Sequence, residues 1–258
     1  MIRAELKADD LSGKLLELAS DTNVCILDSC GVGHLGSHLM VAGVEPVKIV
    51  ELHGEPEDVL AKFETLVEGD NAVIFSISYD FGAKFQRLFL AEIPSSENNE
   101  PDIFAAVFDT LIVYDYTTGK INFIGNRDKS GKIRERISKT NSLKPRDGSS
   151  SLSSNFSRAE YLRKIEEIKE YIRVGDTYQT NLTQQFQASL SDDLTPEIVF
   201  AHVRRDHPAP FAAYLKRLDS TVVSASPERF FRIANGTISA SPIKGTRPRG
   251  ATKAEDDR

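Results

Sequence analysis

The chain has 258 residues, of which 40% are hydrophobic and 27% are charged, a composition typical of a globular protein. Its formal net charge of −6 argues against a nucleic-acid partner, and no apolar run reaches the roughly 20 residues that a membrane span needs. The first residues, MIRAELKADD, are too acidic for a secretory signal, and the two cysteines, Cys25 and Cys30, make no disulfide framework. We therefore expect a cytoplasmic protein.

The first 125 residues contain mostly predicted strands. Runs of β-branched and aromatic residues predict strands at 24–29, 47–52, 72–79 and 104–116. A turn containing Gly119 then joins the last of these to another strand, as in a hairpin.

One early helix is predicted at 54–69. Its apolar residues recur on one face, and Gly69 follows as a stop signal.

The segment CGVGHLG, residues 30–36, has the G-x-G-x-x-G spacing of a dinucleotide-binding turn. A crossover helix of about ten residues or more would have to follow it, but Gly43 stops any helix that begins at Ser37. Asp28 would also place a carboxylate near the phosphates. We interpret this segment as a loop.

His34 and His38 are spaced like helical metal ligands, but no third ligand lies near them in the sequence.

The composition changes between residues 127 and 155, where Lys, Arg, Ser and Gly predominate. This change predicts a flexible linker. It separates an N-terminal region, 1–126, from a second region, 156–258.

The second region begins with a predicted helix. Ser157 and Glu160 form a capping box at its start, and Gly175 suits its end. Its apolar residues predict one buried stripe: Tyr161, Ile165, Ile168 and Ile172.

A predicted strand follows over 177–190, where apolar residues alternate with uncharged polar ones. A solvated sheet face is the ordinary explanation of such alternation, but the absence of Lys and Glu favours the wall of a polar cavity.

Further along the chain, the patterns predict a helix at 196–207 and strands at 211–218, 221–233 and 237–243. Strands and helices do not alternate regularly, which favours an α+β fold with antiparallel sheets.

The stretch SASPIKGTRPRG, residues 239–250, places Lys244 between a proline-broken strand and a glycine. A two-residue hairpin loop at Asn235-Gly236 would put Glu228 and Lys244 on opposite faces, whereas a three-residue loop would put them on the same face. On the same face, an uncharged amine could act as a nucleophile and a protonated carboxyl as an acid. A surface salt bridge at the base of the hairpin is the alternative.

Four segments resemble the chorismate-utilising enzymes, the family that includes aminodeoxychorismate synthase and anthranilate synthase component I. They are GDTYQTNLTQQF (175–186), PAPFAAYL (208–215), SASPERF (224–230) and PIKGTRPRG (242–250). Weaker similarity extends to LDS (27–29), SYDFG (78–82) and VFDTLIVYD (107–115). The resemblance implies an α+β fold in which two antiparallel sheets pack across each other with helices outside.

The resemblance also implies site residues. Anthranilate synthases usually have alanine within the P-I-x-G-T motif and aminodeoxychorismate synthases commonly have lysine, so Lys244 implies attack on C2 of chorismate. Glu228 matches the proposed acid for the departing C4 hydroxyl, and Gly245 and Thr246 match positions that hold a substrate carboxylate. Gln179 stands where water-using relatives have a lysine base.

The implied reaction is the amination of chorismate to 4-amino-4-deoxychorismate, on the route to para-aminobenzoate and folate. The ammonia would come from a glutamine amidotransferase subunit. The family also uses Mg²⁺, whose ligands are expected beyond Arg258. Two alternatives remain: an anthranilate synthase component I, and a truncated fragment without catalytic activity. Neither a nucleic acid nor a membrane is an expected partner.

Overall fold

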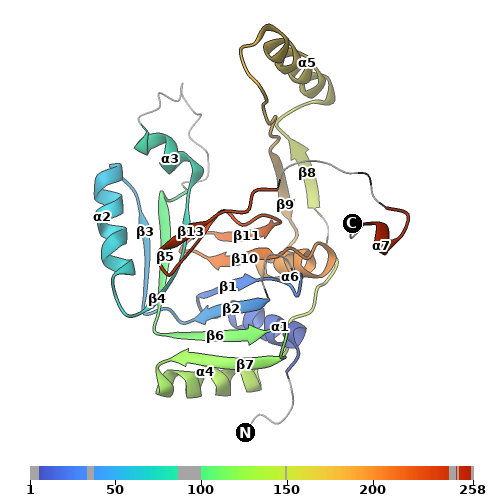
Figure 1. Ribbon diagram of the computed structural model, residues 1–258. Coiled ribbons are helices and arrows are strands. Elements are labelled where there is room, and N and C mark those ends of the chain that lie inside the picture. Colours follow the sequence, from blue (N-terminus) through green and yellow to red (C-terminus); the bar gives the residue numbers. More distant parts are fainter. Residues whose placement is uncertain are drawn as a thin grey trace.

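The computed structural model describes residues 6–33, 38–86, 100–148, 150–243, 248 and 250–256. Within these ranges, six strands form an antiparallel sheet (Figure 1). In sheet order they are β11 (Thr221–Ser226), β10 (Phe211–Lys216), β1 (Val24–Asp28), β2 (Leu39–Val44), β6 (Thr110–Asp115) and β7 (Lys120–Gly125). The sheet therefore combines strands from both halves of the chain.

A second antiparallel sheet has the order β3 (Lys48–Leu52), β5 (Ile103–Phe108) and β4 (Ala72–Ile77). It packs on the first sheet through a shared apolar core, whose buried members are Cys25, Leu215, Ile74, Phe104, Ala106 and Phe108. These two packed antiparallel sheets, with helices outside them, confirm the predicted α+β fold.

The prediction of one strand over 104–116 is wrong. The chain leaves the smaller sheet after Phe108 and enters the larger one at Thr110, so that β5 and β6 belong to different sheets. Asp109, at the crossing point, forms an ion pair with Lys129 at 2.8 Å. An apolar run does not reveal such a crossing, because both of its halves satisfy the same strand pattern.

Close packing between the sheets requires glycine at position 43. A Cβ atom there would lie 2.5 Å from ring carbons of Phe108, whose side chain is itself buried.

We expect Gly43→Ala to lower the free energy of unfolding by about 1–3 kcal/mol, the usual effect of overpacking a core. Chemical denaturation measures this. Gly131→Ala is the matched control: its Cβ meets nothing within 4 Å, so the substitution in helix α4 (Arg127–Lys139) should not destabilise the protein. Equal stability of Gly43→Ala and the wild type would contradict the packing argument.

Three helices cover the other face of the larger sheet: α1 (Ala8–Leu18), α4 and α6 (Pro196–Asp206). Two more, α2 (Pro56–Val67) and α3 (Tyr79–Phe85), pack near the smaller sheet through Val59, Phe81 and Ile103. The predicted helices at 54–69 and 196–207 are thus confirmed as α2 and α6.

The segment 127–155 differs from the flexible linker that its composition predicts. Asn126 caps α4 by accepting a hydrogen bond from the Lys129 amide at 3.1 Å, and Ile133 and Ile137 are buried against the sheet. The segment ends in strand β8 (Ser150–Ser154). Two buried isoleucines four residues apart are enough to dock a helix whose other side chains are polar.

Helix α5 (Arg158–Val174) lies away from the two sheets, beyond a ribbon formed by β8 and β9 (Phe186–Leu190) (Figure 1). The predicted capping box at Ser157 is confirmed, and so is the left-handed Gly175, with φ of 88°. The predicted buried stripe is not: no residue of α5 is buried, and Ile172 is 44% exposed. Tyr161, Ile165 and Ile168 are half-buried, so the described residues cover the apolar side of the helix only in part.

The strand predicted over 177–190 is shorter in the structure, where only β9 pairs with a neighbour. Both faces of β9 are exposed, so the expected packed face is absent among the described residues. The polar residues before it, 177–185, are irregular.

Strands β1 and β2 run antiparallel, with Val24 opposite Val44. A dinucleotide-binding turn needs a helix and a parallel strand after the glycines, so this pairing excludes that alternative for residues 30–36. Residues 34–37, including His34, lie outside the described residues.

Candidate functional site

Three of the predicted site residues, Lys244, Gly245 and Thr246, lie outside the described residues. Their predicted roles stay predictions. The structure does describe the residues just before them and the hairpin that leads to them.

That hairpin consists of β12 (Arg232–Ala234) and β13 (Thr237–Ser239). Ala234 pairs with Thr237, which makes the loop the two-residue alternative, and Asn235 and Gly236 both have positive φ values of 50° and 73°. The ladder ends where Arg232 pairs with Ser239. Because it does not reach Glu228, its register does not decide the face on which that side chain lies.

Glu228 lies two residues after Ser226, the last residue of β11, and is half-buried. The predicted strand 221–233 breaks here because Pro227 cannot donate to a ladder. Ser226 fixes the turn: its hydroxyl donates to the Glu228 carbonyl at 3.0 Å and accepts from the Glu228 amide at 3.4 Å. The next residue, Arg229, places its guanidinium 5.5 Å from the centre of the Phe211 ring. The backbone of Glu228 is therefore held at a defined place, at the end of the sheet.

Gln179 lies in the irregular segment between α5 and β9, and its side chain is exposed. Its backbone carbonyl accepts a hydrogen bond from the Thr177 hydroxyl at 3.2 Å.

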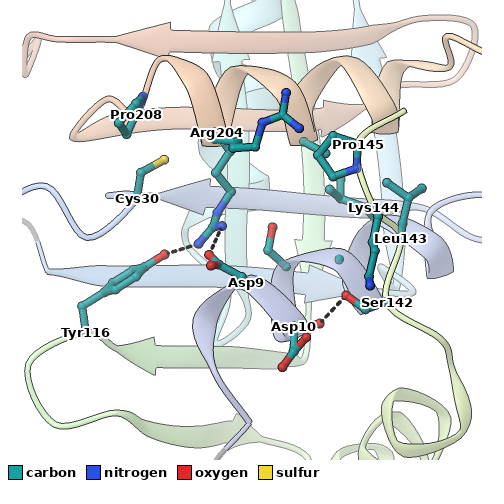
Figure 2. Close-up of a pocket in the computed structure, with 15 residues that line it drawn as sticks. Asp9, Asp10, Cys30, Tyr116, Ser142, Leu143, Lys144, Pro145, Arg204 and Pro208 are labelled. Atoms are coloured by element: carbon teal, nitrogen blue, oxygen red, sulfur yellow. Dashed lines mark hydrogen bonds and ion pairs between the residues drawn. The ribbon is translucent and has the colours of Figure 1, made fainter. Parts of the chain in front are cut away.

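A buried charged network joins β1, α6 and the residue after β6, and sequence reasoning missed it. The Arg204 guanidinium donates to the Asp28 carboxylate at 2.7 Å. It also donates to the Tyr116 hydroxyl at 2.7 Å (Figure 2). Tyr116 in turn donates to Asp28 at 2.7 Å, and Asp9 on α1 completes the network with an ion pair to Arg204 at 2.5 Å. The side chain of Asp28 is fully buried and that of Arg204 is 10% exposed.

The surroundings of this network fix its protonation. Burial acts to lower the pKa of Arg204, but the interactions with Asp28, Tyr116 and Asp9 together outweigh it and raise that pKa above its usual value. Burial, aided by the charge of Asp28, raises the pKa of Tyr116, which stays a neutral hydrogen-bond donor. Burial also raises the pKa of the Cys30 thiol to about 11, so that it is not a thiolate nucleophile at neutral pH.

A cavity of about 460 Å³ opens beside this network (Figure 2). Residues of α1, α6 and the segment 142–145 line it, together with Cys30 and Tyr116. A second cavity, of about 310 Å³, lies where the LDS segment meets the start of β10, and its lining includes Asp28, Ser29 and Phe211. Two of the segments that carry the family resemblance are thus neighbours in space.

In the ranges described above, no three His, Cys, Asp or Glu side chains gather closely enough to hold a metal ion. Nor does any helix there combine the length and the apolar composition of a membrane span.

Comparison with known proteins gives a consistent result. The family model described as chorismate binding enzyme matches residues 34–258. Aminodeoxychorismate synthase component 1 of Escherichia coli is 31% identical over 183 residues, which are 70% of this chain and 39% of that protein. Anthranilate synthase component 1 of Bacillus subtilis is 32% identical over 178 residues, which are 58% of this chain and 34% of that protein.

Among solved structures, anthranilate synthase component I from Streptococcus pneumoniae matches with a TM-score of 0.64 and 16% identity, over 80% of this chain and 54% of that one. At this identity the likeness concerns the fold. The chain spans less than half the length of the two curated relatives, and their alignments do not distinguish between the two activities.

Proposed function

Because the chain belongs to the family of chorismate binding enzymes, we propose that it converts chorismate and ammonia into 4-amino-4-deoxychorismate and water. The observation that carries the choice of product is Lys244 in the stretch PIKGTRPRG, since this position usually holds alanine in the relatives that make anthranilate. The similarity to aminodeoxychorismate synthase component 1 supports the proposal.

In the proposed mechanism, the neutral amine of Lys244 attacks C2 of chorismate while the bond between C4 and its hydroxyl breaks. Glu228 donates the proton with which the hydroxyl departs as water. Ammonia then attacks C4, the bond between C2 and the lysine nitrogen breaks, and one proton from the ammonia returns to Glu228. Lysine and glutamate both end in their starting states, so the cycle is balanced.

The remaining predicted residues bind and orient the substrate. Gly245 and Thr246 offer backbone amides and a hydroxyl to a chorismate carboxylate. Gln179 cannot act as a base toward water, in contrast to lysine at this position, which favours ammonia as the nucleophile.

The proposal includes two further components. Glutamine hydrolysis by an amidotransferase partner would supply the ammonia, and the reaction would take place in the cytoplasm. The family implies Mg²⁺, but no group of described side chains fits such an ion, so no step is assigned to it.

Product identification tests the proposal. The purified protein is incubated with chorismate, an ammonium salt and Mg²⁺, and the products are separated by chromatography with mass detection. We expect 4-amino-4-deoxychorismate. Anthranilate as the main product would replace the proposal with its alternative, which the similarity to anthranilate synthase component 1 keeps open. Absence of both products would contradict catalysis by this chain.

If Glu228 is the proton donor, its replacement should lower the rate of the reaction. Glu228→Gln keeps the size of the side chain but removes its transferable proton, and we expect the rate of 4-amino product formation to fall by about 10²-fold or more. Initial rates over a range of pH measure this. Glu166→Gln, which changes a 70% exposed glutamate on α5, is the matched control and should keep the wild-type rate. A Glu228→Gln rate equal to that of the control would remove Glu228 from the mechanism.

A further inference from the structure

The strand pair β10–β11 ends on one rung, in which Phe211 lies opposite Ser226. From this rung the chain continues through Pro227 to Glu228, the acid of the proposed mechanism. Both members of the rung are half-buried, and each of them contacts a residue of the turn that carries Glu228. The end of the sheet is therefore the part of the fold that can set the direction of this carboxyl side chain.

Ser226 holds the backbone of Glu228 on both sides of its Cα atom. The serine hydroxyl can donate one hydrogen bond and accept others; it donates to the Glu228 carbonyl at 3.0 Å and accepts from the Glu228 amide at 3.4 Å. The amide belongs to the peptide group before the Cα atom, and the carbonyl belongs to the peptide group after it. Because these two groups define φ and ψ of Glu228, the serine also sets the direction of the Cα–Cβ bond.

Phe211 holds the residue that follows Glu228. The guanidinium of Arg229 lies 5.5 Å from the centre of the Phe211 ring, within the range of a cation–π contact. Since Phe211 is the ladder partner of Ser226, both anchors belong to the same rung. Glu228 thus lies between one anchored residue two positions before it and another one position after it.

We propose that Ser226 is a positioning residue for Glu228, an inference that rests on the proposed function, in which Glu228 gives its proton to the departing hydroxyl. The serine acts through Glu228 and not on the substrate: it keeps the backbone in the conformation that directs the carboxyl toward C4 of chorismate. Without the serine hydroxyl, the turn takes up other conformations, and the acid is in place for a smaller fraction of the time. A displacement of about 1 Å can cost about a hundredfold in rate, so even a partial loss of order is measurable.

Steady-state kinetics of Ser226→Ala and Ser226→Thr test this inference, with the rate followed as consumption of chorismate in the presence of ammonium and Mg²⁺. We expect Ser226→Ala to lower kcat by about tenfold and to change KM by less than about twofold, because the acid acts in the chemical step and not in binding. Threonine keeps the hydroxyl and suits a strand, so Ser226→Thr should return kcat to within about threefold of the wild-type value. An equal decrease of kcat in the two variants would contradict the role of the hydroxyl.

The Glu228→Gln background separates positioning from general stability. If Ser226 acts through Glu228, adding Ser226→Ala to Glu228→Gln should change the remaining rate by less than about twofold, since the proton donor is already absent. A merely structural role of Ser226 would lower the rate by the same factor in both backgrounds, and that result would overturn the inference.

Ser154→Ala is the matched control. Ser154 also ends a strand, β8, and its hydroxyl also accepts a hydrogen bond from the amide two residues later, that of Phe156, at 3.1 Å. The control should keep the wild-type kcat. A wild-type protein that consumes no chorismate would contradict the proposed function and this inference together, whereas an active wild type with an equally active Ser226→Ala would contradict this inference alone.

Discussion

Lys244→Ala is expected to reduce formation of 4-amino-4-deoxychorismate by about 10³-fold or more. In the proposed mechanism the amine forms a bond to C2, and alanine offers no group that could replace it. The substitution leaves the proposed acid, Glu228, in place. We therefore expect the loss to appear in kcat rather than only in KM, because binding of the chorismate carboxylates does not depend on the missing bond.

The measurement is the initial rate with saturating chorismate and ammonium, with all products identified. Lys139→Ala is the matched control, because it removes a lysine whose side chain is 74% exposed on α4. The control should keep the wild-type rate. If Lys244→Ala also keeps it and still gives the 4-amino product, the lysine is not the nucleophile. A switch to anthranilate would instead agree with a role of Lys244 in selecting the position of amination.

Arg204→Met is expected to lower the free energy of unfolding by about 3–5 kcal/mol. Removal of one partner of a buried ion pair leaves the other as an uncompensated buried charge. Asp28 is fully buried, and without Arg204 the hydrogen bonds that its carboxylate keeps within the described residues are those from the Tyr116 hydroxyl and the Cys30 amide, at 2.7 and 2.8 Å. The network also ties β1 to α6, so its loss loosens the junction that leads into β10.

Chemical denaturation of Arg204→Met, Asp28→Asn and the double variant measures this effect. We expect the decrease in the free energy of unfolding of the double variant to be smaller than the sum of the two single decreases, because the double variant contains no unpaired buried charge. Arg205→Met is the control: it breaks an exposed pair with Asp206 and should cost at most about 1 kcal/mol. If Arg204→Met lowered the free energy of unfolding no more than Arg205→Met does, the buried network would not stabilise the fold as proposed.

Local patterns predicted the local elements well. The helices α2, α5 and α6 lie within a few residues of their predicted ranges, because apolar spacing and capping residues act within the helix itself. Helix α1 was missed, although Leu11, Leu15 and Leu18 have helical spacing and are buried. The expectation for α5 shows the limit of such patterns: an amphipathic stripe predicts which side is apolar, not what covers it.

The site was predictable in part. The motifs identified the segment of Glu228, but the strand predicted over 221–233 ran across Pro227, and the structure ends it at Ser226. The network of Asp28 and Arg204 was not predicted, because its members lie 176 residues apart and meet only through the sheet. The one local signal was a carboxylate at the end of an apolar strand, VCILDS, a residue that needs a partner once it is buried.

Peptide mapping by mass spectrometry tests the central claim most directly. The protein is incubated with chorismate in the absence of ammonia, so that the proposed intermediate cannot go forward to the 4-amino product. We predict that the peptide containing Lys244 gains the mass of chorismate less one water, and that added ammonium releases 4-amino-4-deoxychorismate and restores the unmodified peptide. An unmodified peptide, from protein that forms the 4-amino product as soon as ammonium is added, would contradict covalent catalysis by this lysine.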